Sequence, residues 1–156
     1  MAQIPYIKNW NEWREGFSFH TEVKIRFSET DAFGHVNNTN AFVYFEVARL
    51  EYLESLGLRE DLKETDSKYM CVVADMHCNY LKQITYGDIL TIYTKIVRIG
   101  RTSIDIHYVA ENQLGEACLT ARGAIVQINR ANGKSAAWSE EQRTILRREF
   151  EKKGTV

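Results

Sequence analysis

Proline, cysteine and long hydrophobic runs are all scarce in this chain. Pro5 is its one proline, and its three cysteines, Cys71, Cys78 and Cys118, are widely spaced. An odd number of cysteines without a Cys-x-x-Cys pair argues against both a disulfide framework and a zinc site, so we expect reduced thiols and no metal. No segment is apolar enough for a signal peptide or a membrane span, so the expected location is the cytoplasm.

The chain also lacks an excess of charge of either sign. Its 20 Lys and Arg residues balance 21 Asp and Glu residues, which gives a formal net charge of -1 at pH 7. A nucleic-acid-binding protein usually shows a basic excess or cluster, and an electrostatic membrane contact needs one too. With 44% hydrophobic and 26% charged residues, the 156-residue chain has the composition of one globular domain. We therefore expect neither nucleic acid nor membrane as a partner.

What the sequence does contain is one strong helical pattern. Apolar residues recur at helical spacing and predict a long helix over 41–56, with Gly57 as its C-terminal cap. The apolar positions of this helix are Ala41, Tyr44, Phe45, Ala48 and Tyr52. Near the C-terminus, Ser139 followed by Gln142 predicts a capping box and a second helix to about Lys152.

Alternation of apolar and polar residues predicts five strands. Their expected ranges are 21–27, 69–80, 89–99, 102–112 and 117–128. In the strand over 69–80 we expect Val72, Met76 and Cys78 on one face, with Asp75 and His77 on the other. The order of elements predicts an α+β domain over 21–156, in which one long helix packs on an antiparallel sheet. Residues 1–20 form an N-terminal extension with no functional interpretation.

A polar loop separates the first predicted strand from the long helix. Its sequence is Glu29-Thr30-Asp31-Ala32-Phe33-Gly34-His35-Val36-Asn37-Asn38. One of Asn38, Thr39 or Asn40 is the expected N-cap of the helix. Capping does not explain why an acid, Asp31, stands so far ahead of the helix.

This loop, continued by Tyr44-Phe45-Glu46-Val47-Ala48-Arg49, resembles the signature of the 4-hydroxybenzoyl-CoA thioesterase-like acyl-CoA thioesterases. A second block, Tyr80-Leu81-Lys82-Gln83-Ile84-Thr85-Tyr86-Gly87-Asp88, also matches, and the resemblance spans roughly residues 21 to 130. It implies the hotdog fold, in which a curved antiparallel sheet wraps one long central helix. It further implies hydrolysis of an acyl-CoA substrate without a cofactor, in a homo-oligomer that is a dimer or a tetramer.

The resemblance also implies roles for residues of the loop. Asp31 matches the acid that serves as nucleophile or general base, and the backbone N–H near Asn38 matches the oxyanion donor. Amides at a helix start suit that second role because they are preorganised donors. His35 and Asn37 either take part in the chemistry or hold the loop. Phe33 stands where acyl-ACP thioesterases have Asn, and its apolar ring would suit an acyl pocket.

Coenzyme A carries phosphates, so basic residues are expected at the mouth of the site. Lys82, Arg98 and Arg101 are the substrate-binding candidates. Glu46 is the second candidate acid, although its spacing from Arg49 also fits an ordinary ion pair on the helix surface.

Two other functions compete with an acyl-CoA thioesterase. An acyl-ACP thioesterase performs the same chemistry on a protein-borne thioester, but the balanced charge does not favour a basic docking patch. A non-catalytic acyl-CoA-binding module would have no need of the Asp31 carboxylate. The sequence does not indicate which acyl group is bound.

Overall fold

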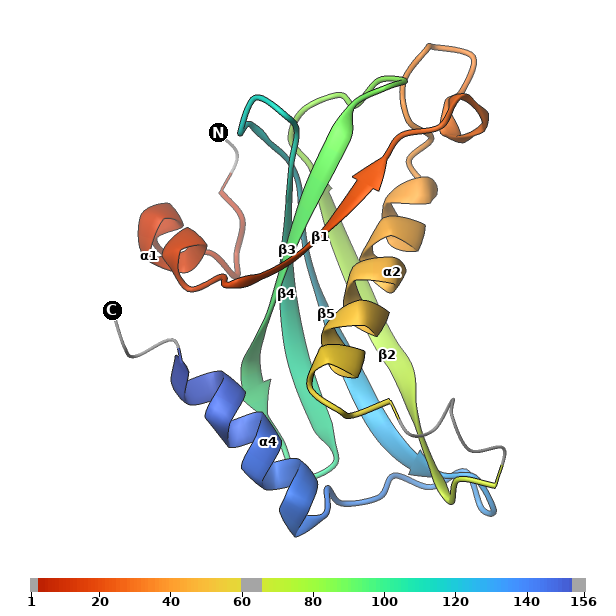
Figure 1. Cartoon of the computed structure of the whole chain (residues 1–156), viewed down its shortest axis with the longest axis vertical. Coiled ribbons are helices and arrows are strands. Elements are labelled where there is room, and N and C mark those ends of the chain that lie inside the picture. The colour runs from red at the N-terminus through yellow and green to blue at the C-terminus, as the bar shows by residue number, and fades with distance from the viewer. Residues whose placement is uncertain (1–2, 60–65, 153–156) are drawn as a thin grey trace.

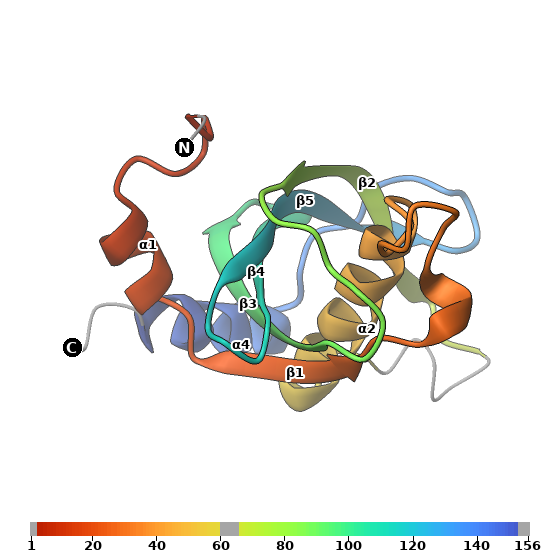
Figure 2. The ribbon, with the colours of Figure 1, turned by 90° about the horizontal axis from the view of Figure 1, so that it is seen from above.

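The computed structural model describes residues 3–59 and 66–152. A five-stranded antiparallel sheet, in the order β1-β3-β4-β5-β2, curves along the long helix α2 (Figure 1). Seen from above, the sheet wraps α2 so that β1 and β2 lie on different sides of it (Figure 2). The strands are β1 (Phe19–Lys24), β2 (Tyr69–Tyr80), β3 (Ile89–Ile99), β4 (Ser103–Glu111) and β5 (Ala117–Asn129). The helices are α1 (Trp10–Glu15), the 3-10 helix η1 (Phe27–Glu29), α2 (Asn40–Ser55) and α4 (Glu140–Glu151).

The predicted α+β architecture is confirmed. The ranges 69–80 and 89–99 agree with β2 and β3, and the helix predicted over 41–56 is α2, followed by Gly57 with a φ of 74°. The first strand instead begins at Phe19 and ends at Lys24. It ends early because the Glu29 carboxylate accepts a hydrogen bond from the Arg26 N–H (2.7 Å) and turns the chain into η1.

The alternation predicted for β2 is wrong in its first half. A β-bulge between Val73 and Asp75 shifts the pairing of β2 with β5. One extra residue reverses the alternation, so Cys71, rather than Val72, packs on the core beside Met76 and Cys78. Next to the bulge, Met76 pairs with Gly123, where a Cβ would collide with Met76 Sδ and stand 2.8 Å from the Asp75 carbonyl oxygen.

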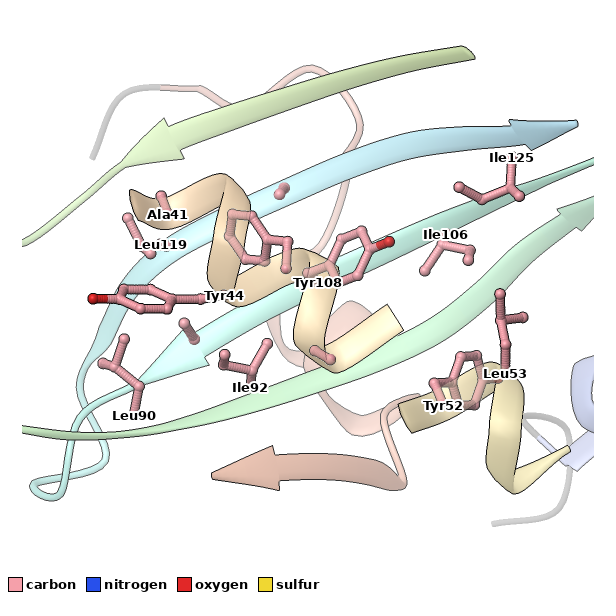
Figure 3. Close-up of a cluster of buried hydrophobic side chains, with 14 of the residues drawn as sticks. Ala41, Tyr44, Tyr52, Leu53, Leu90, Ile92, Ile106, Tyr108, Leu119 and Ile125 are labelled. Carbon is pink, nitrogen blue, oxygen red and sulfur yellow. The ribbon is translucent and has the colours of Figure 1, made fainter. Parts of the chain in front are cut away.

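The main hydrophobic core lies between α2 and the concave face of the sheet. All five apolar positions predicted for the helix are buried. Figure 3 shows Tyr44 of α2 near Leu90 and Ile92 of β3, and Tyr52 of α2 beside Leu53 toward the other end of the core. Alternate residues of the strands supply the sheet side of this core, which is the pattern that strand periodicity predicts.

The N-terminal segment packs on the opposite face of the sheet from α2 (Figure 2). There Trp13 and Phe17 form a second cluster with Val109 of β4. Helix α1 is not among the predicted elements; it begins where the Asn9 side chain accepts hydrogen bonds from two backbone N–H groups. The segment is therefore a packed part of the molecule.

The C-terminal helix α4 has the predicted capping box. The Ser139 hydroxyl accepts from the Gln142 N–H (3.1 Å), and the Gln142 side chain accepts from the Ser139 N–H (2.8 Å). Leu146 is fully buried and fixes α4 on the sheet near the end of β3. Among the described residues, no helix has the length and hydropathy needed to span a membrane.

Candidate active site

The polar loop before α2 is closed by its own backbone. The Asp31 N–H donates to the His35 carbonyl (2.8 Å), and the Gly34 N–H donates to the Asp31 carbonyl (3.0 Å). Gly34 has a φ of 80°, which residues with a Cβ rarely adopt. The glycine therefore lets the chain reverse between the acid and the histidine.

Three longer-range bonds hold this loop against the rest of the fold. The Val36 N–H donates to the Ile84 carbonyl (2.8 Å), and the Asn37 N–H donates to the Glu29 carbonyl (2.8 Å). The Tyr80 hydroxyl, at the end of β2, donates to the Asn38 carbonyl (2.6 Å). The start of α2 is thus fixed between η1 and the β2–β3 connection.

A cavity of about 210 Å³ lies between this loop and the β2–β3 connection. Its floor is built from three buried residues, Ala41, Ile84 and Leu119. Figure 3 shows Ala41 of α2 and Leu119 of β5 side by side at this end of the core. The other lining residues are His35, Val36, Asn37, Asn38, Tyr80, Leu81, Lys82 and Gln83.

Two backbone donors at this cavity are unbonded. Within residues 3–59 and 66–152, the N–H groups of Asn38 and Ala41 have no hydrogen-bond partner. Their neighbours are bonded: the Thr39 N–H donates to Asn37 Oδ1 (3.1 Å), and the Asn40 N–H donates to the Asn37 carbonyl (2.9 Å). Free amides at the positive end of a helix can stabilise a negatively charged oxygen in the cavity that they border.

The catalytic candidates do not all take the same position. Asp31 is half-buried beside the cavity rather than in its lining, and its Oδ1 accepts from the Phe33 N–H (2.9 Å). His35 and Asn38 line the cavity directly. Asn37 lines it too, but its side-chain oxygen accepts from both the N–H and the hydroxyl of Thr39, which favours the loop-structural interpretation. Thr39 is the N-cap of α2 and makes no side-chain cap bond.

The substrate-binding candidates are divided between the two ends of the molecule. Lys82 lines the cavity and forms an ion pair with Glu116. Phe33 is 83% exposed and does not line the cavity. Arg98 is the penultimate residue of β3 and Arg101 follows the strand, so both lie about 30 Å from the start of β3 by strand geometry. Within a single protomer, these two arginines therefore do not lie near the loop.

The surface ion pair suggested for Glu46 and Arg49 is not formed. Arg49 is buried and its guanidinium lies near the hydroxyl of Tyr108, whose pKa is raised by burial and partly lowered again by that positive charge. Glu46 is exposed on α2 and does not line the cavity. The spacing was compatible with a pair, but Arg49 faces the sheet instead.

Sequence reasoning missed two residues that support the loop. Tyr80, which holds the Asn38 carbonyl, was recognised only as part of a matching block. Glu29 is buried beneath the loop. The pKa of Tyr44 is raised to about 12, first by the burial of Tyr44 itself and then by the negative charge of Glu29. The acidic residue type of Glu29, at the start of the motif, was the sequence signal that could have identified it. In the described part of the chain, no three His, Cys, Asp or Glu residues are grouped as a metal site.

The similarity of the chain to known proteins agrees with this geometry. Residues 25–146 match the model of the thioesterase-like superfamily. The uncharacterized protein YsmA of Bacillus subtilis is 40% identical over 137 residues, which are 88% of this chain and 90% of that protein. The structure of a predicted thioesterase from Bacillus stearothermophilus is 34% identical, with a TM-score of 0.75 over 84% of this chain and 95% of the other.

A thioesterase from Thermus thermophilus, solved in complex with coenzyme A and Zn, is 29% identical. Its TM-score is 0.74, over 87% of this chain and 97% of that chain. From the matching motif, the curved sheet around α2 and these similarities, we conclude that the chain belongs to the thioesterase-like superfamily, has the hotdog fold and is a thioester hydrolase.

Proposed function

We propose that the protein hydrolyses an acyl-CoA thioester to a free acid and CoA, without metal or organic cofactor. The observation that carries the proposal is the pair of unbonded amides, those of Asn38 and Ala41, at a cavity beside an acidic loop. Coenzyme A bound to the Thermus thermophilus relative supports CoA as the carrier.

The amides and the acid divide the chemistry. The thioester carbonyl oxygen accepts hydrogen bonds from Asn38 and Ala41, so the negative charge that develops on it is stabilised. The Asp31 carboxylate then acts in one of two ways. It removes a proton from the attacking water, or it attacks the carbonyl carbon to give an acyl-Asp anhydride that water cleaves. Either route expels CoA as the thiolate, and water supplies the atoms of the released acid and thiol.

His35 and Lys82 have supporting roles in this proposal. The His35 ring borders the cavity, where it orients the water or the thioester. Lys82 lies at the rim on the β2–β3 connection, where its ammonium attracts the negatively charged CoA. Lys82 also forms an ion pair with Glu116. Both side chains are partly exposed, so solvent screening keeps this ion pair weak.

We also propose that the protein is a homo-oligomer, a dimer or a tetramer. Strand β2 is at the edge of the sheet and exposes Val73, while α2 exposes Val43 and Val47. An unpaired edge strand with apolar side chains favours association. Sedimentation velocity would give the mass. A cytoplasmic location, expected because the three widely spaced cysteines form no Cys-x-x-Cys pair, is likewise a proposal.

The function is tested by thiol release, measured with a thiol-reactive dye over a panel of aliphatic and aromatic acyl-CoAs. Asp31→Asn should lower turnover by a factor on the order of 10² or more, with folding intact. Glu46→Gln, which removes the exposed acid on α2, is the matched control and should stay close to wild type. If Asp31→Asn retains activity and Glu46→Gln loses it, the acid is Glu46.

Two further results would change the function itself. No turnover of any CoA ester by the wild type, together with saturable binding, would indicate an acyl-CoA-binding module. Turnover of acyl-ACP, with none of the matching acyl-CoA, would replace the CoA carrier by a protein carrier.

A further inference from the structure

Three arginines surround one hollow at the end of the sheet farthest from the cavity described above. The hollow has a volume of about 460 Å³ and is lined by Ile99, Gly100, Arg101, Arg143 and Arg147. Arg101 belongs to the turn between β3 and β4, and the other two arginines stand one helical turn apart on α4. Figure 1 shows α4 beside the sheet, at the opposite end from the start of α2.

The two elements that carry these arginines are bonded together through Trp138. The Trp138 N–H donates to the Arg101 carbonyl (3.1 Å), and the Trp138 carbonyl accepts from Arg143 Nε (3.3 Å). The indole N–H of Trp138 also donates to the Ser103 carbonyl (3.3 Å), and its ring is buried. These bonds hold the Arg101 backbone and the Arg143 guanidinium in position, which lowers the entropy lost when a ligand binds.

The positive charges around this hollow are not compensated. Among the residues that the structure describes, no carboxylate forms an ion pair with Arg101, Arg143 or Arg147. Arg98, close by on β3, does find an acid in Asp105 (3.6 Å). Glu140 has the spacing to reach Arg143 along α4 but is not paired with it. Three like charges at one hollow repel each other, and an anion would relieve that repulsion.

We propose that this hollow is a binding site for a phosphate group. Guanidinium groups bind phosphate oxygens through two parallel hydrogen bonds, and a phosphate monoester offers more oxygens and more charge than a carboxylate. A nucleic acid would need an extended basic surface, which a chain with a formal net charge of -1 does not suggest. The phosphate belongs either to the nucleotide part of a CoA held by a second copy of the chain or to a separate ligand. The first source rests on the proposed function.

The first experiment is calorimetric titration of the intact protein with inorganic phosphate at one fixed, low salt concentration, because salt screens such contacts. The double variant Arg143→Gln/Arg147→Gln should raise the Kd by about tenfold or more, as expected for the loss of charge-assisted bonds. Arg148→Gln is the matched control: it removes an exposed arginine of the same helix that does not line the hollow. Its Kd should change by less than about twofold.

The second experiment identifies the source of the phosphate. CoA and dephospho-CoA, which lacks the phosphate monoester, are titrated into the same three proteins. If the hollow holds the phosphate of CoA, the wild type prefers CoA and the double variant loses that preference. If the double variant binds inorganic phosphate more weakly than the wild type but still prefers CoA to dephospho-CoA, the hollow holds a separate phosphate ligand.

The proposal is overturned if the double variant binds phosphate and CoA as tightly as the Arg148→Gln control does. Neither titration requires hydrolysis. A protein that binds phosphate here but cleaves no thioester would therefore contradict the proposed function and leave this site intact.

Discussion

The indole Nε1 of Trp13 donates a hydrogen bond to Nδ1 of His107, 2.9 Å away, across a sequence separation of 94 residues. Nearby, the Tyr6 hydroxyl lies 2.9 Å from Asn79 Oδ1 and 3.0 Å from Thr120 Oγ1. These contacts attach the N-terminal segment to strands β2, β4 and β5. The segment therefore contributes to stability in addition to covering the outer face of the sheet.

Trp13→Phe should lower the free energy of unfolding by about 2 kcal/mol, because it removes a buried hydrogen-bond donor together with part of a packed ring. Urea denaturation measures the change. Trp10→Phe, at a half-buried position in the same segment, is the control and should lower it by less. Equal losses in the two variants would contradict a special role for the bond to His107.

Lys95 should make stability depend on pH. Its buried ammonium donates to the Trp13 carbonyl, and burial, followed by the positive charge of Arg14, lowers its pKa to about 8. Between that value and the unfolded value of 10.5, the unfolded state binds more protons, so stability rises with pH. The free energy of unfolding should increase from pH 7.5 to 9.5 in the wild type.

Lys95→Met should lack most of that increase, because no lysine with a lowered pKa is then left beneath the N-terminal segment. Urea titrations at both pH values, on both proteins, give the two slopes. Parallel slopes would show that Lys95 titrates as an ordinary lysine.

Asn38→Pro should lower kcat by about 10² to 10³, the range typical for the loss of an oxyanion donor. The change removes the free N–H at the cavity. The bond from the Asn40 N–H to the Asn37 carbonyl closes a turn over residues 37–40. Asn38 is the second residue of this turn, a position that favours proline.

Asn38→Ala is the matched control, since it removes the side chain and keeps the backbone N–H. It should retain kcat within about threefold if the backbone is the donor. A large loss in the alanine variant would instead assign the role to the Asn38 side chain.

Gly123→Ala should destabilise the fold by about 2 kcal/mol, a typical value for overpacking. The added Cβ would meet Met76 Sδ and the Asp75 carbonyl at the β-bulge. Ala124→Ser, which changes the adjacent half-buried residue of β5, should have a smaller effect. The Tm of each variant, measured by thermal unfolding, gives the size of the two effects. A Tm of Gly123→Ala equal to that of the wild type would show that the backbone at the bulge shifts to accommodate the added Cβ without loss of stability.

The long helix and the middle strands could be predicted because their periods of 3.6 and 2 persist over many residues. The bulge in β2 could not, because it is a feature of the pairing with β5, which lies about fifty residues further along the chain. Helix α1 was missed because it is only six residues long, although Asn9 followed by Glu12 resembles a capping signal.

In the candidate site, residues that are close together in the sequence could be grouped correctly, whereas residues brought together only by the fold could not. The loop around Asp31 and His35 could be identified from its motif. The cavity floor could not, since Ile84 and Leu119 reach Ala41 only through the order of the strands. Basic residue type alone grouped Arg101 with Lys82, whereas the length of β3 separates them.

The bond from the Tyr80 hydroxyl to the Asn38 carbonyl joins residues 42 positions apart. Contacts of such high separation form late in folding, because the intervening chain must first be ordered. Helix α2 can therefore form before its first turn is aligned with the cavity. During refolding, helical signal should return ahead of hydrolytic activity, and the delay would report the time that β2 needs to join the sheet.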